Sequence, residues 1–184
     1  LLAKNGWWEQ PAGKGEWTHH AFTFSPGGGA QMYAYDFDGD GDNAVLTSLA
    51  AHGYGLAWFE NTGGKRFTPH IIMSRKKEPG PLDLSFSQLH AIELADMNGD
   101  GVKDIVTGKR YWAHNGRDVG GNDPAVLYWF ETRRGGRAGA CTFIPHKIDD
   151  DSGVGTQVAV ADVNGNGKPD VVVGNKKGTF VHLQ

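Results

Sequence analysis

The sequence predicts an all-β protein built from repeated units of about four antiparallel strands. Three observations support this prediction: an excess of turn-forming residues, three copies of a set of short motifs, and short β-branched runs between turns. The chain of 184 residues contains 28 glycines and 8 prolines, together about 20% where the average is roughly 12%. This composition is typical of many tight turns, and no segment has the periodicity of a helix.

Three short motifs recur in one cyclic order along the chain, which indicates that a single structural unit is repeated. They are an acidic segment at residues 35–41, 95–101 and 161–167, a Trp-aromatic-Glu motif at 7–9, 58–60 and 129–131, and a motif ending in histidine at 17–20, 67–70 and 143–146. The first aspartates of the acidic segments, Asp36, Asp96 and Asp162, are 60 and 66 residues apart.

Short runs of β-branched and aromatic residues flank these motifs and predict strands. Residues 157–161 lead into the third acidic segment, and residues 104–108 and 170–174 lead out of the second and third. Residues 127–131 and 143–148 are the next two strands expected in the second unit. Pro69 and Pro145 place the last strand of a unit at the edge of its sheet, where a missing N–H is tolerated.

Four-stranded units at regular spacing predict the blades of a β-propeller. We expect one segment over 1–184, with a partial blade at 1–29, blades at 30–85 and 86–152, and a partial blade at 153–184. The C-terminal piece could complete the N-terminal blade, which gives about three blades. Propellers typically have four to eight, so we expect either part of a longer propeller, which we favour, or copies that associate into a closed ring. The chain begins with Leu1 rather than Met, in keeping with a processed or excised piece.

The acidic segments predict calcium loops, because calcium takes six to eight oxygen ligands. In the second copy, side-chain oxygens stand at loop positions 1, 3, 5 and 9, and position 7 would offer its backbone carbonyl. These residues are Asp96, Asn98, Asp100, Asp104 and, at position 7, Val102. The loop is not an EF-hand, because Thr107 replaces the glutamate at position 12 and strands flank it.

The other two copies are weaker versions of this loop. The third has two carboxylates in place of three and should bind calcium less tightly; its residues are Asp162, Asn164, Asn166, Lys168 and Asp170. The first has Asp36, Asp38 and Asp40 but Ala44 at position 9, so Asp42 at position 7 is the alternative fourth ligand. A single Asp/Gly loop is as readily an ordinary turn. Three such loops at equivalent positions of the repeat favour up to three calcium sites, which stabilise hairpins and take no part in catalysis.

The pattern D-x-D/N-G-D/N-G-x-x-D, followed by a β-branched strand and glycine, resembles the FG-GAP/VCBS repeats of integrin-like β-propellers. The W-W/F-E and F-x-P-H strands resemble the same repeats, so the resemblance covers essentially the whole chain. It implies calcium-stabilised blades in secreted, extracellular or periplasmic proteins, used in adhesion, in sugar binding or as modules attached to enzymes. Some sugar lyases and dehydratases use related propellers as catalytic domains. The implied calcium ligands are those of the three loops, with the first in doubt at Ala44.

Histidines at one repeat position, His20, His70 and His146, are expected to share a structural role, such as bonding a backbone carbonyl. The residues that break the repeat are better candidates for chemistry. They belong to the second repeat: Lys109, Arg110, Tyr111 and His114 precede a Gly/Asn/Asp-rich insertion at 115–124, and His90 stands just before the first strand of that repeat. Such side chains suit a sugar or an acidic ligand or proton abstraction beside a carbonyl. The alternative is a long surface hairpin with Trp112 packed into the blade interface, and we assign no catalytic residue.

Composition excludes several classes of function. The net charge of −3 excludes a dominant nucleic-acid footprint, and no apolar run reaches the roughly 18 residues of a membrane span. The single cysteine, Cys141, has no basic partner in sequence and is expected to be inert. The leading hypothesis is a calcium-stabilised binding or scaffold module for carbohydrate or protein ligands, and the alternative is an enzyme of the sugar lyase or dehydratase class.

Overall fold

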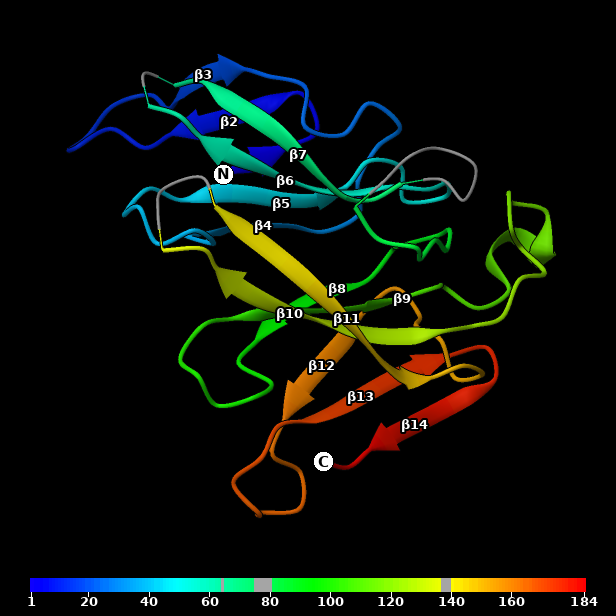
Figure 1. Ribbon diagram of the computed structural model, residues 1–184. Coiled ribbons are helices and arrows are strands. Elements are labelled where there is room, and N and C mark those ends of the chain that lie inside the picture. Colours follow the sequence, from blue (N-terminus) through cyan, green and yellow to red (C-terminus); the bar gives the residue numbers. More distant parts are fainter. Residues whose placement is uncertain (64, 75–80, 137–139) are drawn as a thin grey trace.

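The computed structural model describes residues 1–63, 65–74, 81–136 and 140–184. Within them, fourteen strands form four antiparallel sheets, as the sequence predicted for an all-β chain (Figure 1). We name them the N-terminal, second, third and C-terminal sheets. The one helical element in these ranges is a 3₁₀ turn at Ala113–Gly116, and no helix there has the length and apolar character needed to cross a membrane.

Each sheet follows chain order from one edge to the other. The N-terminal sheet consists of β1 (Leu2–Ala3), β2 (Gly6–Glu9) and β3 (Thr18–Ala21). The second sheet consists of β4 (Met32–Tyr35), β5 (Ala44–Ser48), β6 (Leu56–Asn61) and β7 (Phe67–Met73). The third sheet consists of β8 (Ile92–Ala95), β9 (Asp104–Gly108), β10 (Leu127–Arg134) and β11 (Cys141–Asp149). The C-terminal sheet consists of β12 (Val158–Ala161), β13 (Asp170–Asn175) and β14 (Gly178–His182).

The predicted strand positions are confirmed at the repeated motifs. The Trp-aromatic-Glu motif forms the third strand of the second and third sheets, and the histidine motif forms the fourth. Pro69 and Pro145 lie on β7 and β11, which are edge strands, so neither proline removes a hydrogen bond from the interior of a sheet.

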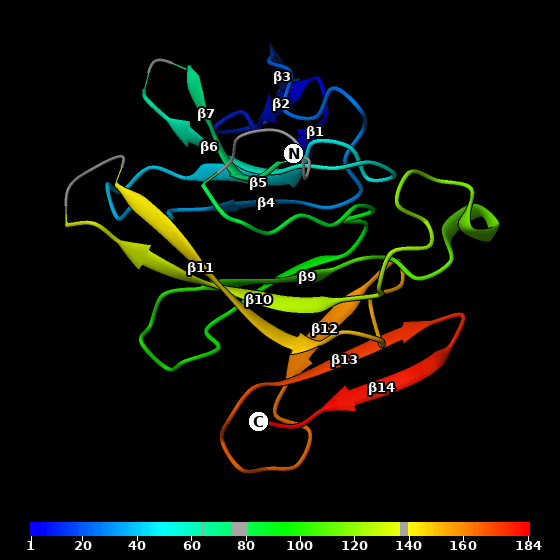
Figure 2. The ribbon, with the colours of Figure 1, turned by 45° about the vertical axis from the view of Figure 1, so that its right-hand side comes forward.

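The two terminal sheets correct one expectation. Figures 1 and 2 show the sheets following one another along the molecule, with the N-terminal and C-terminal sheets at opposite ends. The C-terminal piece therefore does not complete the N-terminal unit. The physical reason is that β1 already pairs with β2 on the side where β13 would have to bind, while β14 occupies the next place beside β13.

Apolar side chains fill the space between successive sheets. Phe24, Val45, Ala57 and Phe59 pack between the N-terminal and second sheets. Fourteen buried residues, including Phe37, Trp58 and Phe143, pack between the second and third sheets, and Val106, Val158 and Val171 belong to the cluster between the third and C-terminal sheets. All five residues of both β5 and β9 are buried, so these strands form the interior of the molecule.

The first strands of neighbouring sheets lie beside one another. The Tyr33 hydroxyl of β4 donates to the Ile92 carbonyl of β8 (2.9 Å), and the Ile92 N–H donates to Gln31 Oε1 (2.5 Å). A cavity of about 460 Å³ is lined by residues of β8, β12 and β13 together with Gln31. The first strands of the second, third and C-terminal sheets therefore share one side of the molecule.

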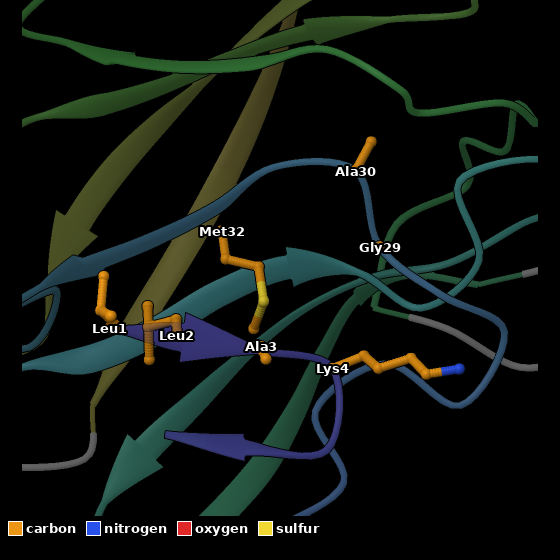
Figure 3. Close-up of a pocket in the computed structure, with 7 residues that line it drawn as sticks. All are labelled: Leu1, Leu2, Ala3, Lys4, Gly29, Ala30 and Met32. Atoms are coloured by element: carbon orange, nitrogen blue, oxygen red, sulfur yellow. The ribbon is translucent and has the colours of Figure 1, made fainter. Parts of the chain in front are cut away.

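A second cavity, of about 550 Å³, lies between the N-terminus and the segment that leads into β4 (Figure 3). Its lining is mainly small or apolar, and Lys4 is the charged side chain among the residues that line it. The Lys4 amine extends away from the other labelled side chains in Figure 3. The cavity therefore offers a surface depression without a set of converging polar groups.

Candidate functional site

Three acidic loops connect the first and second strands of the second, third and C-terminal sheets. The first aspartate of each loop accepts hydrogen bonds from two glycine N–H groups further along. The pairs are Asp36 with Gly39 (2.7 Å) and Gly41 (3.2 Å), Asp96 with Gly99 (2.7 Å) and Gly101 (2.8 Å), and Asp162 with Gly165 (2.7 Å) and Gly167 (2.8 Å). All six glycines have φ between 77° and 96°, a region that glycine adopts without strain. Glycine therefore lets each loop close around its first aspartate.

The side chains at positions 3 and 5 are held in the same way in all three loops. In the second loop, Asn98 Oδ1 accepts from the Asp100 N–H (3.0 Å) and Asp100 Oδ1 from the Val102 N–H (2.8 Å). The third loop repeats these bonds at 3.0 and 2.8 Å, and the first at 3.4 and 2.8 Å. The three loops therefore share one arrangement of oxygen atoms.

The aspartate at position 9 ties its loop to a neighbouring segment. Asp104 accepts hydrogen bonds from the N–H groups of Met97 (2.9 Å) and Thr132 (2.8 Å). Asp170 likewise accepts from Val163 (3.0 Å) and Gln184 (2.9 Å). Both aspartates are fully buried. Burial raises the pKa of Asp104 to about 6 although the two amide donors lower it, so a nearby cation would stabilise its charged form.

The first loop lacks this aspartate and is held by an arginine of the third sheet. Ala44 stands at position 9, and Arg134 donates from Nε to the Phe37 carbonyl (3.2 Å) and from Nη2 to the Asp36 carbonyl (2.5 Å). The Arg134 guanidinium thus holds the first loop from a neighbouring sheet, whereas the other two loops are held by an aspartate of their own repeat. Beside this loop, burial and the Asp38 charge raise the pKa of Cys141 to about 12, so the thiol stays protonated.

The oxygen donors of the loops fit a hard cation such as calcium. In the first loop, which we expected to be the least complete, one carboxylate oxygen each from Asp36, Asp38 and Asp40 lie within 4.8 Å of one another. The second and third loops offer the same positions with one and two amide oxygens in place of carboxylates. Residues Asp42, Val102 and Lys168 follow at position 7, where a backbone carbonyl would be the ligand.

The repeated histidines form a second recurrent structure with tryptophan and glutamate. His20, His70 and His146 face Trp7, Trp58 and Trp129 across their strand pairs, with ring centroids 4.2, 4.6 and 4.2 Å apart. Their Nε2 atoms lie 2.8, 2.7 and 3.0 Å from carboxylate oxygens of Glu9, Glu60 and Glu131. The expected shared structural role is confirmed, but the partner is a glutamate carboxylate and not a backbone carbonyl.

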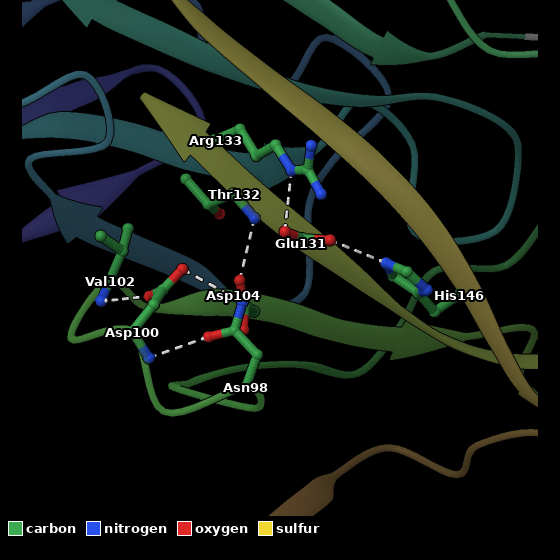
Figure 4. A network of polar contacts seen from close by, with 8 residues as sticks. All are labelled: Asn98, Asp100, Val102, Asp104, Glu131, Thr132, Arg133 and His146. Carbon is green, nitrogen blue, oxygen red and sulfur yellow. Dashed lines mark hydrogen bonds and ion pairs between the residues drawn. The ribbon is translucent and has the colours of Figure 1, made fainter. Parts of the chain in front are cut away.

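Figure 4 shows how the second loop and this histidine pair lie near one another around β10. Glu131 contacts Arg133 (2.8 Å) and His146 (3.0 Å), and these hydrogen bonds lower the pKa of the Glu131 carboxyl. The adjacent Thr132 N–H donates to Asp104. Strand β10 therefore contacts His146 of β11 through Glu131 and the acidic loop through the Thr132 N–H.

The five symmetry-breaking candidates do not converge on one point. Lys109 is fully buried and its Nζ donates to the Gly121 carbonyl (3.1 Å), and burial lowers its pKa. Tyr111 faces Lys177, whose Nζ lies 5.0 Å from the ring centroid. His90 and His114 instead both contact His52, with ring centroids 5.3 and 4.7 Å from it. Burial lowers the pKa of His90, and the positive charge of Arg110 lowers it further.

Trp112 does not pack into an interface between sheets. It is 40% exposed, and its backbone has φ 52° and ψ 38°, in the left-handed region. The ring instead covers Gly116 of its own insertion, where a Cβ atom would come within 2.9 Å of it. The Lys176 amine donates to the Trp112 carbonyl (3.1 Å), so the insertion is tied to the C-terminal sheet through its backbone.

Sequence reasoning missed His52 and Asp118. His52 lies in the β5–β6 loop and Asp118 in the insertion after the 3₁₀ turn, and the sequence offered no spacing signal because 66 residues separate them. His52 lies between the second and third strands of its sheet, as His114 does in the third sheet, and this shared place in the repeat is the signal that could have drawn attention to it. The structure places both residues against His114.

Comparison with known proteins bears directly on the loops. A model of the FG-GAP-like repeat matches residues 36–107, and a model of the FG-GAP repeat matches residues 154–181. The matched ranges contain all three acidic loops and together cover more than half of the chain. Among curated proteins the comparison finds no match. The chain is an FG-GAP repeat protein.

Proposed function

We propose that the chain is a calcium-stabilised β-propeller segment that serves as a binding or scaffold module outside the cytoplasm. The observation that carries the proposal is the common geometry of the three acidic loops, in which the oxygens at positions 1, 3 and 5 are held by equivalent backbone hydrogen bonds. FG-GAP repeats are typical of extracellular proteins, and the millimolar calcium found there fills even weak sites.

In this proposal each sheet is a blade or part of one, with units at 1–29, 30–85, 86–152 and 153–184. The adjacent first strands β4, β8 and β12 would line the propeller axis. The C-terminal sheet supports the presence of a further blade, since Val181 on its edge strand β14 is 51% exposed. That blade would come from more of the same protein or from a second copy. Carbohydrate or protein is the ligand class that we propose for the assembled surface.

Calcium is expected to stabilise the fold. At a calcium concentration about 100 times Kd, the free energy of unfolding should rise by about 2.7 kcal/mol, which for a chain of this size corresponds to a Tm increase of roughly 5–11 °C. Differential scanning calorimetry with calcium and with a chelator measures the shift, and titration calorimetry measures the heat of binding. No heat together with a Tm that ignores the chelator would refute the proposal.

Two loop variants and one control sharpen the calcium test. Asp96→Ala should remove the largest part of the calcium shift, and Asp162→Ala a smaller part, because the third loop has fewer carboxylates. Asp150→Ala serves as the control, since this aspartate is exposed, lies outside the loops and pairs with Lys147. The control should keep the whole shift; an equal loss in all three variants would contradict binding at the loops.

A further inference from the structure

Two histidines and an aspartate form a compact cluster outside the calcium loops. His52 Nδ1 lies 3.0 Å from Asp118 Oδ2. His114 Nδ1 lies 3.1 and 3.0 Å from Asp118 Oδ1 and Oδ2. The two imidazole rings stack with centroids 4.7 Å apart at an interplanar angle of 27°, so both Nδ1 atoms are directed at the same carboxylate.

The cluster joins the second and third sheets at their loops, beside the apolar core and the polar contacts of Tyr33, Gln31 and Arg134 that also connect these sheets. His52 comes from the β5–β6 loop of the second sheet, and His114 and Asp118 come from the insertion between β9 and β10 of the third. The Asp118 side chain is 17% exposed, while His52 and His114 are 44% and 60% exposed. The carboxylate therefore lies at the base of the cluster, and the imidazoles leave one side open to solvent.

The backbone around His114 adopts an uncommon conformation. His114 and Asn115 have φ of 45° and 59°, next to Trp112 at 52°. Three of the five non-glycine residues with positive φ in the described part of the chain thus stand within four consecutive positions. Such conformations gather at functional sites, where the surrounding structure maintains them.

We propose that His52, His114 and Asp118 form a binding site for a divalent transition metal such as zinc, separate from the calcium loops. One ligand atom from each residue already lies within 4.8 Å of the others. In a tetrahedral zinc site with bonds of about 2.0–2.2 Å, the ligand atoms stand about 3.3 Å apart, so small side-chain shifts produce the site. The metal would bind the two Nδ1 atoms that now face the carboxylate, and each neutral imidazole would carry its N–H at Nε2.

The donor set selects against calcium. Imidazole nitrogen suits zinc, copper, iron and nickel, whereas calcium and magnesium take oxygen ligands. Three protein ligands leave the fourth position of a tetrahedral metal for water or a bound molecule. His90 packs edge-on against His52, with centroids 5.3 Å apart, but it is not one of the three residues whose ligand atoms lie within 4.8 Å of one another. We therefore do not assign it as a ligand.

Titration of the whole chain with zinc chloride, in buffer that contains saturating calcium, tests the site. We expect one zinc ion per chain. His114→Ala and Asp118→Asn should each weaken binding by more than the roughly 10- to 100-fold typical of losing an outer partner. His70→Gln is the matched control, because His70 also pairs with a carboxylate, Glu60 at 2.7 Å, but with no second histidine; its zinc affinity should equal that of the parent.

Three further readouts make the result decisive. Circular dichroism of each variant confirms that the fold is kept, and Asp118→Asn, which preserves the side-chain shape, supplies the test if His114→Ala fails to fold. Cobalt(II) should produce visible absorption bands in the parent and in His70→Gln but not in Asp118→Asn. Asp96→Ala should lose the largest part of the calcium stabilisation and keep zinc binding, which separates this site from the calcium proposal. Absence of zinc uptake by the parent, or uptake unchanged in His114→Ala and Asp118→Asn, would overturn the assignment.

Discussion

Asp104→Ala is expected to lower the free energy of unfolding by about 2–6 kcal/mol in the absence of calcium. The substitution leaves the Met97 and Thr132 N–H groups without their carboxylate acceptor, and each buried unsatisfied donor costs about 1–3 kcal/mol. Urea unfolding in the presence of a chelator measures the difference. The same substitution should also abolish the calcium response of the second loop, because Asp104 is its proposed position-9 ligand.

Asp100→Ala separates the two roles of the loop carboxylates. The Asp100 side chain belongs to the same loop but is exposed, and it accepts hydrogen bonds from Val102 and Asn98 inside the loop. In chelator its cost should stay below about 1 kcal/mol, within the usual range for exposed positions, while in calcium both variants lose stabilisation. Equal destabilisation of the two variants in chelator would show that the buried hydrogen bonds of Asp104 are not what hold the loop to β10.

Phe24→Ala is expected to cost about 3–5 kcal/mol, the usual range for truncating a buried phenylalanine. Phe24 is fully buried, and its ring contacts Phe59 (5.2 Å between centroids), Phe67 (5.0 Å) and Phe22 (4.8 Å). These contacts form much of the apolar interface that holds the N-terminal sheet on the second sheet. We therefore expect the N-terminal sheet to open before the rest of the molecule unfolds.

Hydrogen exchange followed by mass spectrometry measures this local opening. Peptides from residues 1–21 should lose protection in Phe24→Ala while peptides from β9 and β10 keep theirs. Val181→Ala is the control, since its side chain is exposed and its loss should change stability by about 0.5 kcal/mol or less. Uniform loss of protection across the chain would mean that the N-terminal sheet does not open as a separate unit.

The repeated motifs allowed much of the fold to be predicted. Pro69 and Pro145 placed β7 and β11 at sheet edges, and the β-branched run at residues 170–174 marked β13. Such features depend on residues close together in the chain: a proline lacks an N–H wherever it stands, and alternating β-branched residues favour a strand locally. The spacing of aspartate, asparagine and glycine likewise predicted the register that the three loops share.

Other features needed contacts that no motif encodes. The partner of His146 is Glu131 on the adjacent strand, and this pairing depends on the register between β10 and β11. The buried role of Asp104, in β9, depends on the position of Thr132 in the adjacent strand β10. Trp112 was expected in an interface, and it lies outside because the left-handed backbone of the insertion folds its ring over Gly116.

Turn and strand preferences act over a few residues, so they were sufficient to predict the all-β class, the repeat and the shape of the acidic loops. The folded chain was needed to show that Arg134 supports the first loop, that His52 meets His114 and Asp118, and that the terminal sheets stay apart. Each of these results follows from how whole sheets pack against one another. Residues in different sheets meet only when the buried apolar clusters fix the distance and orientation between the sheets, which a motif within one repeat does not specify.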